Sequence, residues 1–135
     1  MSRTPRIHVC SFSYHGSGIP ADPTGHGGGF VFDCRFLPNP GREERYRDRT
    51  GRDPDVASFL EAREEARAFR ERVFRMVEDA VEGVRAKEYE DFTVCFGCTG
   101  GRHRSVWLAE ELCRHLSGRG ERCDLTHHDL PGENP

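Results

Sequence analysis

Residues 91–116 read DFTVCFGCTGGRHRSVWLAEELCRHL, an apolar run followed by a glycine-rich turn and an amphipathic segment. The run at 91–97 has the length of a buried strand, and residues 106–116 carry apolar side chains at helical spacing. A strand that leads through a tight turn into a helix is typical of parallel α/β proteins. We therefore predict an α/β fold with this stretch at its centre.

Shorter apolar runs on both sides extend the predicted sheet. Residues 7–12 and 30–36 are predicted to be strands, the second ending before Pro38-Asn39-Pro40 because proline cannot donate to a β-ladder. A last strand is predicted within 123–130. The expected architecture is a small, mostly parallel sheet flanked by helices.

The helical part is predicted to lie between the second and third strands. Asp53-Pro54-Asp55 combines a capping acid, a proline at the first helical position and a second acid near the positive end of the helix dipole. Apolar residues then recur at helical spacing as far as Val84, which indicates one long helix or two helices separated near 62–65. The charged stretch 41–51 is predicted to be an exposed loop.

Length and composition limit the classes of protein. The 135 residues fit one domain, 1–135, with a core at about 6–128. The formal net charge of -3 gives no overall attraction to nucleic acid, so RNA binding requires a local basic patch. No apolar stretch suits a signal peptide or a membrane span, so we expect a cytoplasmic location, no membrane partner and reduced cysteines.

The turn at 98–105 predicts an anion site. Its glycines let backbone N–H groups converge, and the helix start adds unpaired N–H donors with a partial positive charge. Arginine and hydroxyl side chains supply further donors. We predict that the turn binds a small phosphorylated metabolite through Thr99, Gly100, Gly101, Arg102, His103, Arg104 and Ser105.

The same turn also fits Cys-x-x-Gly-x-x-Arg-Ser, the pattern of cysteine-dependent phosphatases. In such an enzyme Cys98 would attack phosphorus as a thiolate. Gly97 stands where phosphatases often have histidine, and no acid-bearing loop is evident, so the phosphatase is an alternative to a non-enzymatic binding module. No cofactor or metal is expected, because Cys95 and Cys98 lack a second ligand pair and no Walker motif is present.

Three motifs resemble the C-terminal domain of RapZ, the bacterial RNase adapter family. They are residues 11–20, residues 31–40 and residues 97–106, and the resemblance runs from about 7 to about 127. It implies a fold like part of 6-phosphofructokinase, binding of glucosamine-6-phosphate and small regulatory RNAs, and self-association. It also implies that Ser11, Asp33 and Arg35 contact the sugar.

The departures from this family pattern change two expectations. Full-length members add an N-terminal P-loop domain that is missing here, so ATP or GTP binding is not expected. The segment 127–135 lacks the basic residues of the family, so RNA binding is expected to be weak. An RNA-binding adapter stays an alternative, as does a protein partner or a second copy. The basic residues that could contact RNA in such an adapter are Arg42, Arg45, Arg47, Arg49 and Arg52.

Overall fold

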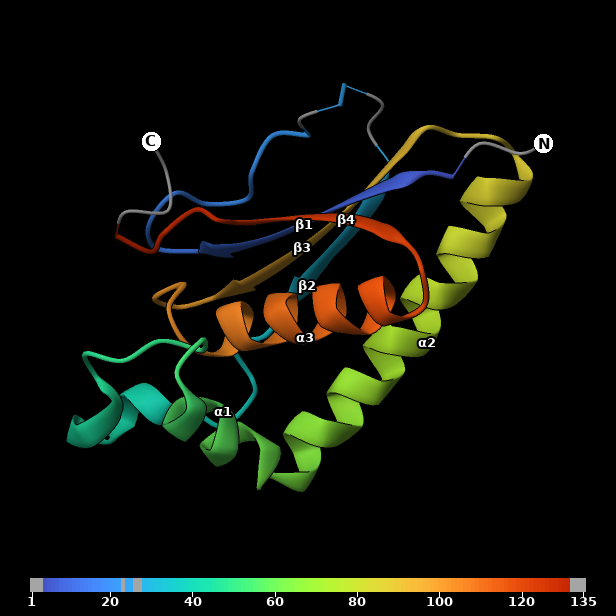
Figure 1. Ribbon diagram of the computed structural model, residues 1–135. Coiled ribbons are helices and arrows are strands. Elements are labelled where there is room, and N and C mark those ends of the chain that lie inside the picture. The colour runs from blue at the N-terminus through green and yellow to red at the C-terminus, as the bar shows by residue number, and fades with distance from the viewer. Residues whose placement is uncertain (1–3, 23, 26–27, 132–135) are drawn as a thin grey trace.

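Four parallel strands form one sheet in the part of the chain that the computed structural model describes, residues 4–22, 24–25 and 28–131 (Figure 1). The strand order is β2-β3-β1-β4, so the first strand lies inside the sheet beside the third. This architecture confirms the predicted α/β class with a parallel sheet. The strands are β1 (Arg6–Ser13), β2 (Gly29–Asp33), β3 (Asp91–Cys98) and β4 (Arg122–His127).

Helices cover one face of this sheet, and Pro20 and Ala21 of the segment after β1 lie against the other (Figure 1). The core beneath the helices contains alternate residues of the central strands, such as Val9 and Phe96, together with Trp107 and Leu112 of α3. Within the described residues, no helix is long and apolar enough to cross a bilayer. The helices are α1 (Pro54–Glu61), α2 (Glu64–Ala86) and α3 (Arg104–Gly118).

The long helical region divides at Ala62 and Arg63, within the interval that the apolar spacing indicated. Helix α1 begins at Pro54 as predicted, but Asp53 does not cap it with its side chain. Its carboxylate instead accepts the N–H of Thr50 at 2.7 Å, which ties down the loop before the helix. The proline and the helix dipole therefore define this helix start without a side-chain cap.

Both outer strands end before the predicted segments do. Strand β2 ends at Asp33 because its carboxylate accepts the N–H of Arg35 at 2.9 Å and bends the chain into a turn. The N–H of Leu37 then donates to the carbonyl of Cys34 at 3.2 Å, which closes this turn. Strand β4 ends at His127 and does not continue toward residue 130.

The predicted loop 41–51 is only partly exposed, which corrects the expectation. It contains two short 3-10 helices, η1 (Pro40–Arg42) and η2 (Glu44–Tyr46). The ring of Tyr46 is buried and packs edge-on against Phe59 of α1, with ring centroids 5.4 Å apart. Its aromatic surface favours burial despite the charged neighbours in sequence.

Candidate functional site

A small pocket of about 210 Å³ opens at the carboxyl end of β3 and the start of α3. Ligands of open α/β sheets bind at this end of the strands. We call this the turn pocket. It is lined by Asn39, Gly41, Arg47, Cys98, Thr99, Gly100, Arg102, His103 and Arg104.

The sequence of the turn explains its shape. Gly101 has a φ of +67°, a backbone conformation that side chains rarely adopt. A Cβ there would come within 2.8 Å of the backbone nitrogen of Ser13, so glycine also permits the close approach to β1. The hydroxyl of Ser13 donates to the carbonyl of Thr99 at 2.6 Å. The turn is therefore held against the end of the neighbouring strand.

The pocket lining is strongly basic. Arg47, Arg102 and Arg104 line it, and none of the described residues of the lining is acidic. The Nε atoms of Arg102 and Arg104 are buried donors for which the described residues supply no hydrogen-bond acceptor. The start of α3 adds backbone donors and a partial positive charge. The site therefore suits an anion with several oxygen atoms.

Arg104 also has a structural role that the sequence did not indicate. Its side chain is 4% exposed, and its Nη1 donates to the carbonyls of Arg35 at 2.6 Å and of Leu37 at 3.1 Å. These two carbonyls belong to the turn after β2. Arg104 is the first residue of α3, so these bonds hold the turn after β2 against the start of the helix. The same side chain lines the pocket.

His103 connects the turn to the segment that carries η1 and η2. Its Nε2 donates to the carbonyl of Tyr46 at 2.8 Å. Burial lowers the pKa of His103 below its ordinary value, which favours the neutral ring at physiological pH. Gly51 packs against the start of α3, and its N–H donates to the carbonyl of Arg102 at 2.8 Å. Residues 39–51 therefore form one wall of the site.

A second pocket of about 550 Å³ adjoins the first, with Asn39, Thr99 and Arg104 lining both. We call this the outer pocket. It adds three arginines and one acidic residue to the site, together with apolar surface. Its other lining residues are Arg35, Phe36, Leu37, Pro38, Arg42, Glu43, Phe59 and Arg63.

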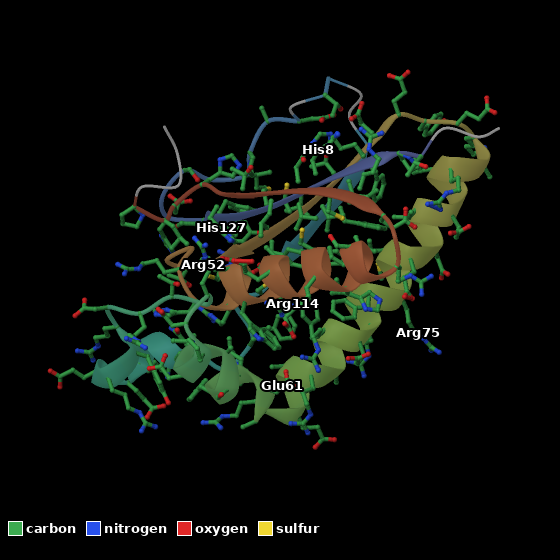
Figure 2. All side chains as sticks on the ribbon, viewed as in Figure 1. His8, Arg52, Glu61, Arg75, Arg114 and His127 are labelled. Atoms are coloured by element: carbon green, nitrogen blue, oxygen red, sulfur yellow. The ribbon has the colours of Figure 1, made fainter. Side chains whose placement is uncertain are left out.

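Four of the predicted site residues do not line either pocket: Gly101, Ser105, Ser11 and Asp33. Ser11 is fully buried, and its Oγ lies 2.6 Å from the Nδ1 of His127. His127 in turn contacts Glu110 of α3, which pairs with Arg52 at 3.2 Å (Figure 2). Ser11 therefore belongs to a polar chain between β1, β4 and α3.

Asp33 lies at the rim of the site and is paired with another predicted residue. The guanidinium of Arg35 contacts its carboxylate at 2.6 Å and stacks over the ring of Tyr14, 3.9 Å from the ring centroid. The hydrogen bonds from Arg35 hold the pKa of Asp33 below its ordinary value. This ion pair positions the Arg35 side chain beside the outer pocket.

The geometry of Cys98 does not favour the phosphatase alternative. Cys98 lines the floor of the turn pocket, but it is only 2% exposed and belongs to the apolar core beneath the helices. Its sulfur lies 3.1 Å from the hydroxyl of Ser105, which is itself fully buried. A nucleophile needs an open path for attack in line with the leaving group. Among the described residues, no group of His, Cys, Asp and Glu side chains is placed to hold a metal ion.

Sequence reasoning did not assign Asn39, Gly41 and Arg47 to the pocket. Asn39 was part of a recognised motif, and Arg47 was part of the basic run considered for RNA. Their approach to the glycine-rich turn depends on how residues 39–51 pack against α3. The spacing of two motifs in the sequence carries no information about that packing.

Comparison with known proteins places this chain in a family. The family model for the RapZ C-terminal domain matches residues 5–131. The chain belongs to the RapZ C-terminal domain family. The match covers the whole of the sheet, the three helices and both pockets, and it confirms the resemblance seen in the motifs.

Relatives of this RapZ C-terminal domain are longer proteins named nucleotide-binding protein. One from Solibacter usitatus is 37% identical over 92% of this chain and 37% of its own length. One from Ruegeria is 38% identical over 94% of this chain and 40% of its own length. One from Kocuria rhizophila is 39% identical over 95% of this chain and 40% of its own length. The chain thus spans about two fifths of the length of these relatives.

Proposed function

We propose that this domain is a binding module for a small phosphorylated ligand of the sugar-phosphate class, such as glucosamine-6-phosphate. The observation that carries the proposal is the turn pocket, where three arginines and a helix start surround one small space without an acidic side chain. Such a set of donors suits a phosphate monoester, because arginine binds phosphate oxygens through parallel hydrogen bonds.

The adjoining outer pocket supports a ligand larger than phosphate alone. A phosphate group in the turn pocket would leave the rest of the ligand near Asn39 and Thr99, which line both pockets. These side chains offer hydrogen-bonding groups for sugar hydroxyls. The carboxylate of Glu43, which pairs with Arg45 at 3.2 Å, also lines the outer pocket and offers an acceptor to a ligand that carries an amino group beyond its phosphate. Membership of the RapZ C-terminal domain family agrees with this ligand class.

Arg47 supplies the first test of the binding module. Its side chain is exposed, so replacement with alanine is expected to leave the free energy of unfolding within about 0.5 kcal/mol of the original. The variant Arg47→Ala should weaken binding of glucosamine-6-phosphate by about 10- to 150-fold, the effect of losing a hydrogen bond of about 1.5–3 kcal/mol to a charged group. Isothermal titration calorimetry measures this change directly.

The controls separate the phosphate from general charge effects. Arg75→Ala removes the same charge from α2, away from the labelled Arg52 and His127 (Figure 2), and should leave the affinity unchanged. Glucosamine without phosphate should bind at least 10-fold more weakly, while inorganic phosphate should compete. Equal affinities of Arg47→Ala and the original protein would remove Arg47 from the site. Absence of binding by every phosphate ester at millimolar concentration would contradict the proposed function.

RNA binding is a second candidate, and the outer pocket is the observation that favours it. Arg35, Arg42 and Arg63 continue the basic surface beyond the turn pocket, with Glu43 as the acidic residue of that lining. Arginines gathered on one surface can contact phosphates of a nucleic acid backbone. The net charge of -3 means that any such binding depends on this local surface.

A gel-shift titration with a structured RNA tests this candidate. We expect binding at low salt, with a steep loss of affinity as salt rises, because phosphate contacts release counterions. The double variant Arg42→Ala/Arg63→Ala should reduce the slope of log affinity against log salt by about 1.4–1.8, since each lost contact removes about 0.7–0.9. No shift at low salt would exclude this function and leave the sugar-phosphate proposal intact.

A further inference from the structure

The sheet face opposite the helices carries two cysteines in direct contact. Cys10 of β1 and Cys95 of β3 are register partners on neighbouring strands. The thiol of Cys10 donates to the sulfur of Cys95 over 2.8 Å. Together with Phe12 they form a buried cluster separate from the core beneath the helices. Both side chains are free thiols in this structure.

The register of the two strands places the Cα atoms of this pair at a spacing that a disulfide can bridge. A disulfide joins residues whose Cα atoms are about 4.4–6.8 Å apart. Neighbouring strands are spaced by about 4.7–4.9 Å, so residues paired in register fall within that range. Closure would shorten the sulfur–sulfur distance from 2.8 Å to about 2.05 Å.

A small cavity gives access to the two thiols. Its volume is about 190 Å³, and both cysteines contribute to its lining. Its walls also include His8 and His128, and Pro20 and Ala21 of the segment after β1. Because a water molecule occupies about 30 Å³ of the liquid, the cavity can admit a reagent as small as hydrogen peroxide.

The hydrogen bond between the thiols makes them chemically unequal. Donation from Cys10 lowers the pKa of the Cys95 thiol, and the same bond raises the pKa of Cys10. The thiolate is the nucleophilic form of cysteine. This arrangement makes Cys95 the acceptor of the hydrogen bond and places Cys10 beside it to resolve an oxidised product. By contrast, the sulfur of Cys98 faces the hydroxyl of Ser105.

We propose that Cys10 and Cys95 form a peroxide-oxidisable dithiol that closes into a disulfide between β1 and β3. The Cys95 thiolate attacks one oxygen of hydrogen peroxide, which gives a sulfenic acid and releases hydroxide. The Cys10 sulfur then attacks the sulfur of that sulfenic acid. The S–S bond forms, the S–O bond breaks, and water leaves with the proton of Cys10. Peroxide takes up the two electrons that the two sulfurs lose.

Peroxide oxidation of Cys10 and Cys95 is best tested in a variant that lacks the other pair of neighbouring thiols, Cys113 and Cys123. A hydrogen bond with Cys123 lowers the pKa of Cys113 to about 7, so this pair would also react with peroxide. The variant Cys113→Ser/Cys123→Ser retains the four other cysteines. Treatment of this folded protein with hydrogen peroxide should remove two thiols per chain and lower the mass by two hydrogen atoms. A dithiol reductant should reverse both changes.

Further substitutions identify the two sulfur atoms that are joined. Trypsin leaves Cys10 with Cys34 in peptide 7–35 and Cys95 with Cys98 in peptide 88–102, so peptide mapping needs variants. The cross-link between these peptides should disappear in Cys10→Ala and in Cys95→Ala, and should persist in Cys34→Ala. In Cys10→Ala, dimedone should trap the sulfenic acid on Cys95.

Two results would overturn the proposal. One is a thiol count that peroxide leaves unchanged while circular dichroism reports a folded protein. The other is a cross-link that survives in Cys95→Ala, which would assign the disulfide to different cysteines. Neither readout depends on a phosphorylated ligand, so failure of the sugar-phosphate proposal would leave this result interpretable.

Discussion

Replacement of Arg104 with alanine is expected to lower the free energy of unfolding by about 3 kcal/mol or more, since each hydrogen bond to a charged group contributes about 1.5–3 kcal/mol. The side chain is buried, and it donates to the carbonyls of Arg35 and Leu37. Its removal would leave both carbonyls without this partner and would create a cavity. Urea denaturation followed by circular dichroism measures the change.

The same substitution should abolish measurable binding of a phosphate ester. Arg104 lines both pockets and holds the turn after β2 that forms part of their wall. The variant Arg104→Lys keeps the charge but cannot reproduce the planar fork, so it should recover only part of the stability. A change in unfolding free energy below about 0.5 kcal/mol, the usual size for a surface position, would show that the two carbonyl bonds contribute little.

Gly51→Ala is expected to have the second largest effect. A Cβ at this position would lie 2.3 Å from the carbonyl oxygen of His103 and 2.4 Å from the backbone nitrogen of Trp107. Both atoms belong to the backbone at the start of α3, so neither can move as a flexible side chain could. We expect a loss of about 2–3 kcal/mol in the free energy of unfolding, the upper part of the range for overpacking.

The displaced segment also forms a wall of the turn pocket, so Gly51→Ala should weaken phosphate-ester binding by at least 10-fold. Gly83→Ala is the matched control for stability. Nothing lies within 4 Å of a Cβ at Gly83 in α2, and alanine there should raise the unfolding free energy by about 0.5–1 kcal/mol. Thermal unfolding of the two variants should therefore shift in opposite directions. Equal melting temperatures would refute the close contact at Gly51.

These two positions differ in how far the sequence could identify them. Arg104 was assigned to the phosphate site because it follows a glycine-rich turn, but its bonds to the carbonyls after β2 depend on β2 lying beside β3. Gly51 carried no functional signal, because its need for glycine comes from the backbone of α3, about fifty residues later in the chain. Ser11 matched a family motif, yet its strand position buries it beside His127.

Local signals in the chain were enough to predict the elements and the anion turn. Pro54 marks the start of α1, apolar spacing marks α2 and α3, and the paired glycines before Arg102 mark the turn after β3. These features act through the backbone preferences of neighbouring residues, so they can be recognised without the fold. The same reasoning predicted a parallel sheet, because strands and helices alternate along the chain.

The composition of the pockets and the contact between Cys10 and Cys95 required the folded structure. The strand order β2-β3-β1-β4 brings residues 39–47 against the turn after β3 and sets Cys10 beside Cys95, 85 positions later in the chain. Long-range pairing of this kind depends on which surfaces bury one another when the chain collapses. The spacing of apolar residues in the sequence indicates whether a segment is a helix or a strand. The register between distant strands is set only when the whole core packs.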